Sequence, residues 1–279
     1  MDTLTSETNV KTTSSDGKIR DFLKIDHICR SFGALKALDD INFSVNQGEV
    51  FSIIGPNGAG KTTLFNVMTG IHQATGGKVI FNGEDITNLE PHIVAKKGIA
   101  RTFQIVRVFD NMSVLENTIV GCHCRLTSRI SDVIFNTKHL KDENKQIREK
   151  CIKLLADVGM ADYQNTIARN LPLGLRKRLQ VARALATDPS ILLLDEPTGG
   201  MNPTEKEKMM DLINYLKQTG LTIMLVEHDM GVIMGISDRI VVLDHGVKIA
   251  EGSPEEIQNN DLVIEAYLGK GFKDGAAES

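Results

Sequence analysis

The sequence predicts an α/β protein with a mainly parallel sheet, on three observations. A short apolar strand at 50–54 is followed directly by a glycine-rich loop and then by a segment with helical spacing at 62–69. Three further apolar runs each follow a helical segment, and this alternation indicates parallel strands in a buried sheet. Those runs lie at 191–194, 222–226 and 240–243. Strand signals fade between about residues 106 and 186, so we expect a helical insertion there.

Composition bounds the class of protein. With 279 residues, 41% of them hydrophobic, the chain can bury one sizeable core, or one core with a smaller lobe. The formal net charge of -4 offers no basic face, so nucleic acid is not an expected partner. The apolar runs are far shorter than the roughly 20 residues that cross a bilayer, and no charged-then-apolar leader opens the chain. We therefore expect a cytoplasmic protein that reaches a membrane only through a partner.

The N-terminal part predicts a smaller β region. Residues 1–20 are rich in Thr and Ser without periodicity, so we expect a disordered tail, with order beginning near Phe22. Alternating apolar residues between 23 and 45 predict antiparallel strands. The run 79–81, followed by Asn82-Gly83, predicts another strand and a tight turn. One domain over 21–269 and a C-terminal tail at 270–279 complete the expected organisation.

Two helices are marked clearly. An apolar stripe predicts a helix that ends at Gly159, and its members are Ile147, Cys151, Leu154, Leu155 and Val158. Asn202, Pro203 and Glu205 are suited to the N-cap, N1 and N3 positions of a second helix, which Gly220 closes. The four cysteines suit a reducing compartment, and the spacing in Cys122-His123-Cys124 is too tight for a structural zinc pair.

The glycine-rich loop predicts a nucleotide site. Its glycines can adopt positive φ, so that successive N–H groups converge on anionic oxygens. Lys61 is expected to reach the β- and γ-phosphates, the Thr62 hydroxyl to ligate Mg²⁺, and the following helix to direct its N-terminal dipole at the charge. The predicted binding residues are Gly55, Pro56, Asn57, Gly58, Ala59, Gly60, Lys61, Thr62 and Thr63.

Polar residues at the ends of two apolar strands predict the chemistry. Asp195 ends the strand that begins at Ile191 and is suited to hold Mg²⁺ through water, while Glu196 next to it could act as a general base. His228 follows the strand 222–226 and is placed to hydrogen-bond the γ-phosphate. Gln104 stands where the α/β pattern gives way to the helical one, and its amide could touch the metal or the attacking water. Phe32 could stack on an adenine ring.

The order of these motifs resembles the ATPase subunit of an ATP-binding cassette transporter, over about residues 22–269. Within that superfamily the chain is most similar to the branched-chain amino acid uptake group. The stretches that carry this narrower resemblance are 98–104, 226–230, 235–239, 252–256 and 265–269. The resemblance implies a P-loop NTPase (RecA-like) core, an N-terminal antiparallel β subdomain and an inserted α-helical subdomain at about 106–186. It also implies ATP and Mg²⁺ as ligands.

The resemblance further implies a head-to-tail dimer, formed with a second copy or a paralogue. Each ATP would lie between the Gly55 loop of one subunit and a signature loop of the other. That loop usually carries a serine and a glutamine around a glycine, whereas this chain has Pro172, Gly174 and Leu175 at the corresponding places. Gly174 and the helix start can still face a phosphate. Pro172 supplies neither hydroxyl nor N–H, so we expect intact binding in one subunit and a less stable closed dimer.

These observations lead to a hypothesis with two alternatives. The chain would hydrolyse ATP at the cytoplasmic face of the inner membrane and drive permease subunits. An extracytoplasmic solute-binding protein would deliver the solute to these permeases. Residues 106–117 and the insertion would form the groove that receives a permease helix, while the polar run 138–150 is either the edge of that groove or a solvated face. One alternative is a nucleotide-gated binding module with little turnover. The other is an importer ATPase for amides, urea or another small solute. A DNA- or ribosome-associated relative and a GTP-binding protein are weaker alternatives.

Overall fold

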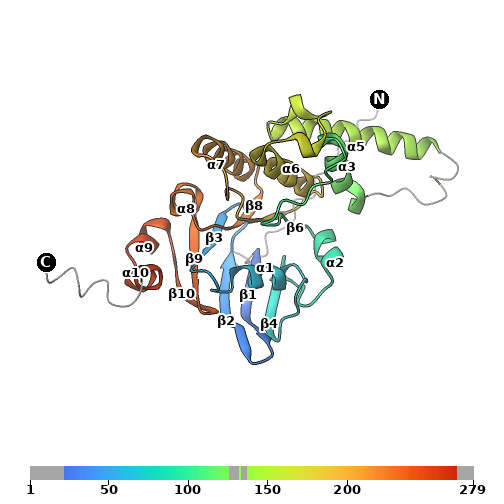
Figure 1. The fold of residues 1–279 in the computed structure, drawn as a ribbon. Coiled ribbons are helices and arrows are strands. Elements are labelled where there is room, and N and C mark those ends of the chain that lie inside the picture. The colour runs from blue at the N-terminus through green and yellow to red at the C-terminus, as the bar shows by residue number, and fades with distance from the viewer. Residues whose placement is uncertain (1–21, 126–131, 133–136, 269–279) are drawn as a thin grey trace, which may run out of the picture.

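The computed structural model describes residues 22–125, 132 and 137–268. A six-stranded sheet occupies the centre, with a group of helices at one end and a four-stranded antiparallel sheet at the other (Figure 1). The predicted tails at 1–20 and 270–279 lie outside the described residues. Within the described residues, no helix is long and apolar enough to span a membrane.

The central sheet has the strand order β10-β9-β3-β8-β7-β6. Its strands are β3 (Val50–Ile54), β6 (Ile99–Arg101), β7 (Ile191–Asp195), β8 (Thr222–Val226), β9 (Arg239–Asp244) and β10 (Val247–Gly252). Only β10 pairs antiparallel, with β9; the other pairs are parallel. Every residue of β3, β7 and β8 is buried, which explains their continuous apolar runs. The predicted fold class is confirmed, although β6 and β10 carried no strand signal that the sequence analysis used.

The second sheet has the order β2-β1-β4-β5, and all its pairs are antiparallel. It consists of β1 (Leu23–Phe32), β2 (Leu35–Val45), β4 (Gly76–Phe81) and β5 (Glu84–Asp85). The predicted tight turn joins β4 to β5, and both of its residues, Asn82 and Gly83, have positive φ.

The helices α3 (Val114–Gly121), α5 (Lys138–Asp157) and α6 (Leu173–Leu185) lie together at one end of the molecule (Figure 1). Short 3-10 segments accompany them at Cys122–Arg125, Ala161–Tyr163 and Ala168–Asn170. The apolar stripe of α5 buries Cys151 and Leu155, and Gly159 follows the helix with φ 69°. The Sγ atoms of Cys122 and Cys151 lie 3.5 Å apart in this buried region. Residues 138–150 are mostly exposed, so the polar run is a solvated helix face.

Within the described residues, six further helices lie around the sheets: α1 (Lys61–Met68), α2 (Pro91–Lys96), α7 (Pro203–Gln218), α8 (Met230–Ile236), α9 (Pro254–Gln258) and α10 (Asp261–Leu268). The predicted start of α7 is confirmed: Asn202 and Glu205 form a reciprocal capping box with Pro203 at N1. Two apolar cores lie on opposite faces of the central sheet. The side chains of β3 alternate between the two faces and so contribute to both cores. Its Val50 and Ile54 pack into one core, and its Phe51 and Ile53 pack into the other. This packing fixes the end of β3, from which the glycine-rich loop departs.

Candidate active site

The loop between β3 and α1 has the backbone conformation that the sequence predicts. Gly55, Gly58 and Gly60 have φ values of 148°, 85° and 102°. A Cβ at Gly55 would lie 2.0 Å from the carbonyl oxygen of Leu243 at the end of β9, so only glycine fits between loop and sheet. The loop is therefore held against the carboxyl ends of the central strands, where ligands of open α/β sheets bind.

The ammonium group of Lys61 lies inside this loop. Its Nζ donates to the carbonyl oxygens of Gly55 at 2.6 Å and Pro56 at 2.9 Å. Burial lowers the pKa of Lys61, and the Glu196 and Asp195 carboxylates oppose that shift. The N-cap of α1 is Gly60, which has no side-chain acceptor for the first N–H groups of the helix. A lysine beside an uncapped helix N-terminus fits an anionic phosphate group.

Asp195 ends β7 and forms a buried ion pair that sequence reasoning missed. Its Oδ2 lies 2.8 Å from Arg101 Nη2, and the two side chains are 3% and 6% exposed. Arg101 comes from the end of β6 and also donates to Asn66 Oδ1 of α1 at 2.7 Å. Arg101 thus joins the helix behind the phosphate loop to the predicted magnesium residue. In the sequence, Arg101 is a single arginine three residues before Gln104, and nothing near it along the chain indicates that Asp195 is its partner.

The three predicted catalytic side chains meet beyond Asp195. Gln104 Nε2 donates to Glu196 Oε2 at 2.8 Å, and His228 Nδ1 lies 3.8 Å from Glu196 Oε1. Glu196 has φ 48°, a left-handed conformation that is costly for a residue with a Cβ. His228 is 62% exposed, so its ring remains accessible from solvent. The Gln104 amide thus hydrogen-bonds one oxygen of the Glu196 carboxylate, and the His228 imidazole lies near the other oxygen, at the same 3.8 Å from Glu227 Oε2.

Glu227 is a second residue that the sequence analysis missed. It is 1% exposed, and its carboxylate accepts hydrogen bonds from the backbone N–H and hydroxyl of Thr198. Its other oxygen accepts a hydrogen bond from the main-chain N–H of His228 at 3.1 Å. Because a buried carboxylate needs such donors, these contacts fix the segment after Glu196 against the loop that follows β8.

Phe32 and Gly174 lie apart from this cluster. Phe32 ends β1, with the Arg30 guanidinium 4.3 Å from its ring centroid and the His72 ring at 5.3 Å edge-on. Gly174 is the second residue of α6, and a Cβ there would lie 2.7 Å from Glu205 Oε1. Neither residue forms a hydrogen bond or ring contact with the phosphate loop within the described part of the chain. Their roles toward adenine and a partner's phosphate stay predictions.

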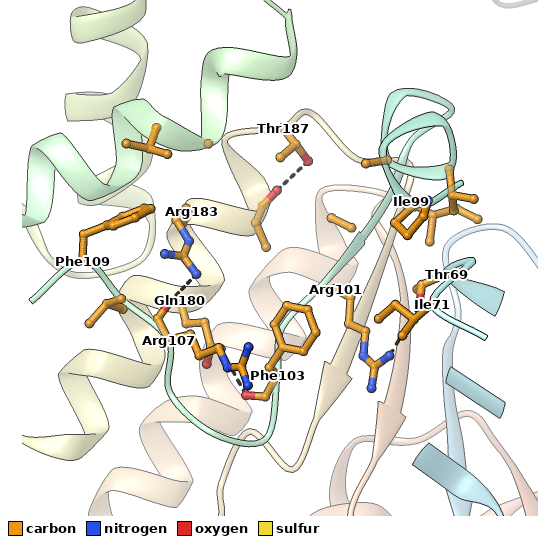
Figure 2. A pocket seen from close by; sticks show the side chains of 18 residues that line it. Thr69, Ile71, Ile99, Arg101, Phe103, Arg107, Phe109, Gln180, Arg183 and Thr187 are labelled. Carbon is orange, nitrogen blue, oxygen red and sulfur yellow. Dashed lines mark hydrogen bonds between the residues drawn. The ribbon is translucent and has the colours of Figure 1, made fainter. Parts of the chain in front are cut away.

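A separate groove of about 590 Å³ lies between the central sheet and the helical end (Figure 2). Thr69, Ile71 and Ile99 line one wall, and Phe109, Arg183 and Thr187 line the other. Arg101 and Phe103 lie at the bottom of the view, in the segment that runs on to Gln104 (Figure 2). The segment 107–109 contributes to the lining, and the docking of a permease helix at residues 106–117 stays a prediction. No residue from 138–150 does so.

Two protein-family models and several characterised relatives match this chain. A family model described as "ABC transporter" matches residues 38–199, and one described as "Branched-chain amino acid ATP-binding cassette transporter" matches residues 247–273. The chain is 41% identical over 252 residues to the high-affinity branched-chain amino acid transport ATP-binding protein BraF of Pseudomonas aeruginosa, covering 90% of this chain and 99% of that protein. It is 39% identical to the corresponding LivG protein of Escherichia coli K12, covering 89% and 98%.

Solved structures give the same result. A nucleotide-free ATP-binding cassette from an ABC transporter superposes with a TM-score of 0.78 at 35% identity, covering 89% of this chain and 99% of that one. A cassette in its ADP conformation gives 0.78 at 34% identity over the same shares. A dimeric bacterial ABC transporter cassette gives 0.71 at 25% identity, covering 83% and 98%. With its phosphate loop and the acidic residues at the carboxyl ends of β7 and β8, the chain belongs to the family of ATP-binding cassette (ABC) transporter ATPases.

Proposed function

We propose that this chain is the ATP-hydrolysing subunit of an importer for branched-chain amino acids, working at the cytoplasmic face of the membrane. The observation that carries the proposal is the convergence of Gln104 and His228 on the Glu196 carboxylate, directly after Asp195. A binding module has no need for a carboxylate oriented in this way. The relatives BraF and LivG, and the family match at residues 247–273, support the solute class.

Each residue has a defined task toward ATP. The loop N–H groups and Lys61 bind the phosphates, and Phe32 offers a ring for the adenine. Thr62 and Gln104 would supply oxygen donors to Mg²⁺, Asp195 would hold the ion through water, and the bound ion would neutralise charge on the phosphates. Glu196 accepts the proton of the attacking water, and His228 orients the γ-phosphate.

The proposal includes three kinds of partner. A second ATPase subunit, either another copy or a paralogue, would complete each nucleotide site with its Gly174 loop, as the dimeric cassette among the structural neighbours suggests. Permease subunits would place a cytoplasmic helix in the groove of Figure 2, whose lining is largely apolar and includes Phe103 and Phe109. An extracytoplasmic solute-binding protein would deliver the amino acid to the permeases.

One observation favours the alternative of a nucleotide-gated module. Pro172 is the N-cap of α6 and forms no side-chain capping bond, so the helix end that would face a partner's phosphate has one donor fewer than a serine gives. This weakens dimer closure without removing the chemistry of Glu196. We therefore keep turnover as the proposed activity.

The test is phosphate release from the chain assembled with its permeases in nanodiscs. The expected result is steady release by the parent and a loss of about a hundredfold or more in Glu196→Gln, with ATP binding retained. Equal, near-zero rates in parent and variant would favour the binding module. With the solute-binding protein present, stimulation by leucine, isoleucine or valine supports the proposed solute, whereas stimulation only by urea or an amide contradicts it.

A further inference from the structure

Lys177 lies on α6, one turn beyond Gly174, and its side chain is directed into the protein. Only 7% of the residue is exposed, and its Nζ donates to the main-chain carbonyl oxygen of Glu196 at 2.7 Å. A Cβ built on Gly199 would lie 3.3 Å from the same nitrogen. The ammonium group is therefore packed against the turn that follows Glu196.

This contact holds one side of a strained residue. Glu196 has φ 48°, a left-handed conformation that is strained for a non-glycine residue and persists only where neighbours fix it. On the other side, the Glu196 N–H donates to the Val226 carbonyl oxygen at 2.8 Å. Val226 and Lys177 thus clamp both peptide groups of Glu196, together with the Gly199 N–H, which donates to the same Glu196 carbonyl oxygen at 3.3 Å. The backbone held in this way carries the carboxylate that accepts a hydrogen bond from Gln104.

Nearby carboxylates explain why a buried lysine is tolerated here. Burial lowers the pKa of Lys177, and the negative charges of Glu227 and Glu196 oppose that shift. The Glu227 carboxylate is itself bonded to Thr198 in the turn after Glu196. A buried ammonium with an acceptor and a counter-charge is stable, whereas the same group without them would be expelled or neutralised.

We propose that Lys177 is a positioning residue for Glu196, joining the two nucleotide sites of an ATPase dimer. The inference rests on the proposed function, in which Gly174 faces the ATP held by the partner subunit while Glu196 acts on the ATP of its own subunit. Gly174 and Lys177 lie one turn apart at the start of α6 and both are buried, so a shift of this helix end moves both residues. A displacement of α6 on capture of the partner's nucleotide is thereby transmitted to the Glu196 backbone. Lys177 itself touches neither ATP nor the attacking water.

Kinetics of the permease-bound complex test this coupling. Lys177→Met keeps the volume and removes the ammonium group, and we expect kcat to fall about tenfold while KM for ATP stays within twofold. The Hill coefficient for ATP should fall toward one, and Lys177→Arg should restore most of kcat because it keeps a charged donor. An unchanged kcat, or a loss matched by an equal rise in KM, overturns the proposal.

Amide hydrogen exchange tests the clamp without any ATP hydrolysis. In the chain without permeases, the amides of residues 196–201 should exchange faster in Lys177→Met than in the parent. Arg178→Met is the matched control, since this neighbouring cation also donates to main-chain carbonyls, those of Val158 and Lys208. It should leave exchange at 196–201 unchanged. Equal exchange in parent and Lys177→Met overturns the proposal, even if the parent proves to hydrolyse no ATP and the proposed function fails.

Discussion

Breaking the buried pair between Arg101 and Asp195 should destabilise the fold strongly. Both side chains are almost fully buried and their bond is 2.8 Å long, so removal of either charge leaves the other unpaired in a poorly solvated site. Such losses cost about 3–5 kcal/mol. Arg101→Met also loses the Asn66 bond and the guanidinium contacts with Phe65 and Phe103, whose ring centroids lie 5.4 and 5.3 Å away. We therefore place Arg101→Met toward the upper part of that range.

A double-mutant cycle isolates the pair itself. Arg101→Met, Asp195→Asn and the double variant should be unfolded in urea and followed by circular dichroism, because the chain has no tryptophan to report fluorescence. The double variant removes both charges, so its loss should be smaller than the sum of the single losses by roughly 2–3 kcal/mol. Strictly additive losses, or single losses below about 1 kcal/mol, would refute this reasoning.

A matched arginine lies at the far end of the same sheet. Arg239 pairs with Glu49 at 3.1 Å and with Glu251, and its guanidinium lies 5.2 Å from the Phe51 ring centroid. It is more exposed than Arg101, so Arg239→Met should cost about 1 kcal/mol or less from its ion pairs. A similar loss of unfolding free energy in Arg239→Met and Arg101→Met would mean that burial does not determine the cost of removing the guanidinium.

Two further predictions concern the backbone. Gly55→Ala should abolish Mg·ATP binding in calorimetry, since its Cβ would collide with the Leu243 carbonyl oxygen. The Cβ of Gly58→Ala meets no atom within 4 Å, so this variant should bear only a backbone strain of about 1 kcal/mol. Equal binding of Mg·ATP by both variants would contradict the packing argument. Pro172→Ser should tighten the ATP-induced dimer about tenfold or more in ultracentrifugation, because it adds one charge-assisted hydrogen bond at each nucleotide site. An unchanged dimer would show that this position does not limit closure.

Local rules predicted the elements that carry strong local signals. The buried runs of β3, β7 and β8, the capping box at Asn202 and the glycine conformations of the phosphate loop all follow from residue type and spacing. The strands β6 and β10 were missed for physical reasons. β6 has only three residues, and β10 is half-exposed without clear alternation, so the neighbours in the sheet decide their conformation.

The site was predicted as a set of residues, but its connections were not. Gln104, Glu196 and His228 were identified one by one, and the fold brings their side chains together. Arg101 and Lys177 could not be assigned from the sequence, because a buried cation resembles a surface cation until its partner is known. Their acceptors lie 94 and 19 positions away along the chain. Contacts at such separations depend on sheet order and helix packing.

Calorimetric titration of Mg·ATP into the purified chain tests the central claim most directly. The parent should bind one nucleotide, and Lys61→Ala should bind it about 10- to 100-fold more weakly, as expected for loss of a hydrogen bond to a charged group. Lys145→Ala, which changes an exposed lysine of α5, should match the parent. Undiminished binding by Lys61→Ala, or no binding by the parent, would contradict the account.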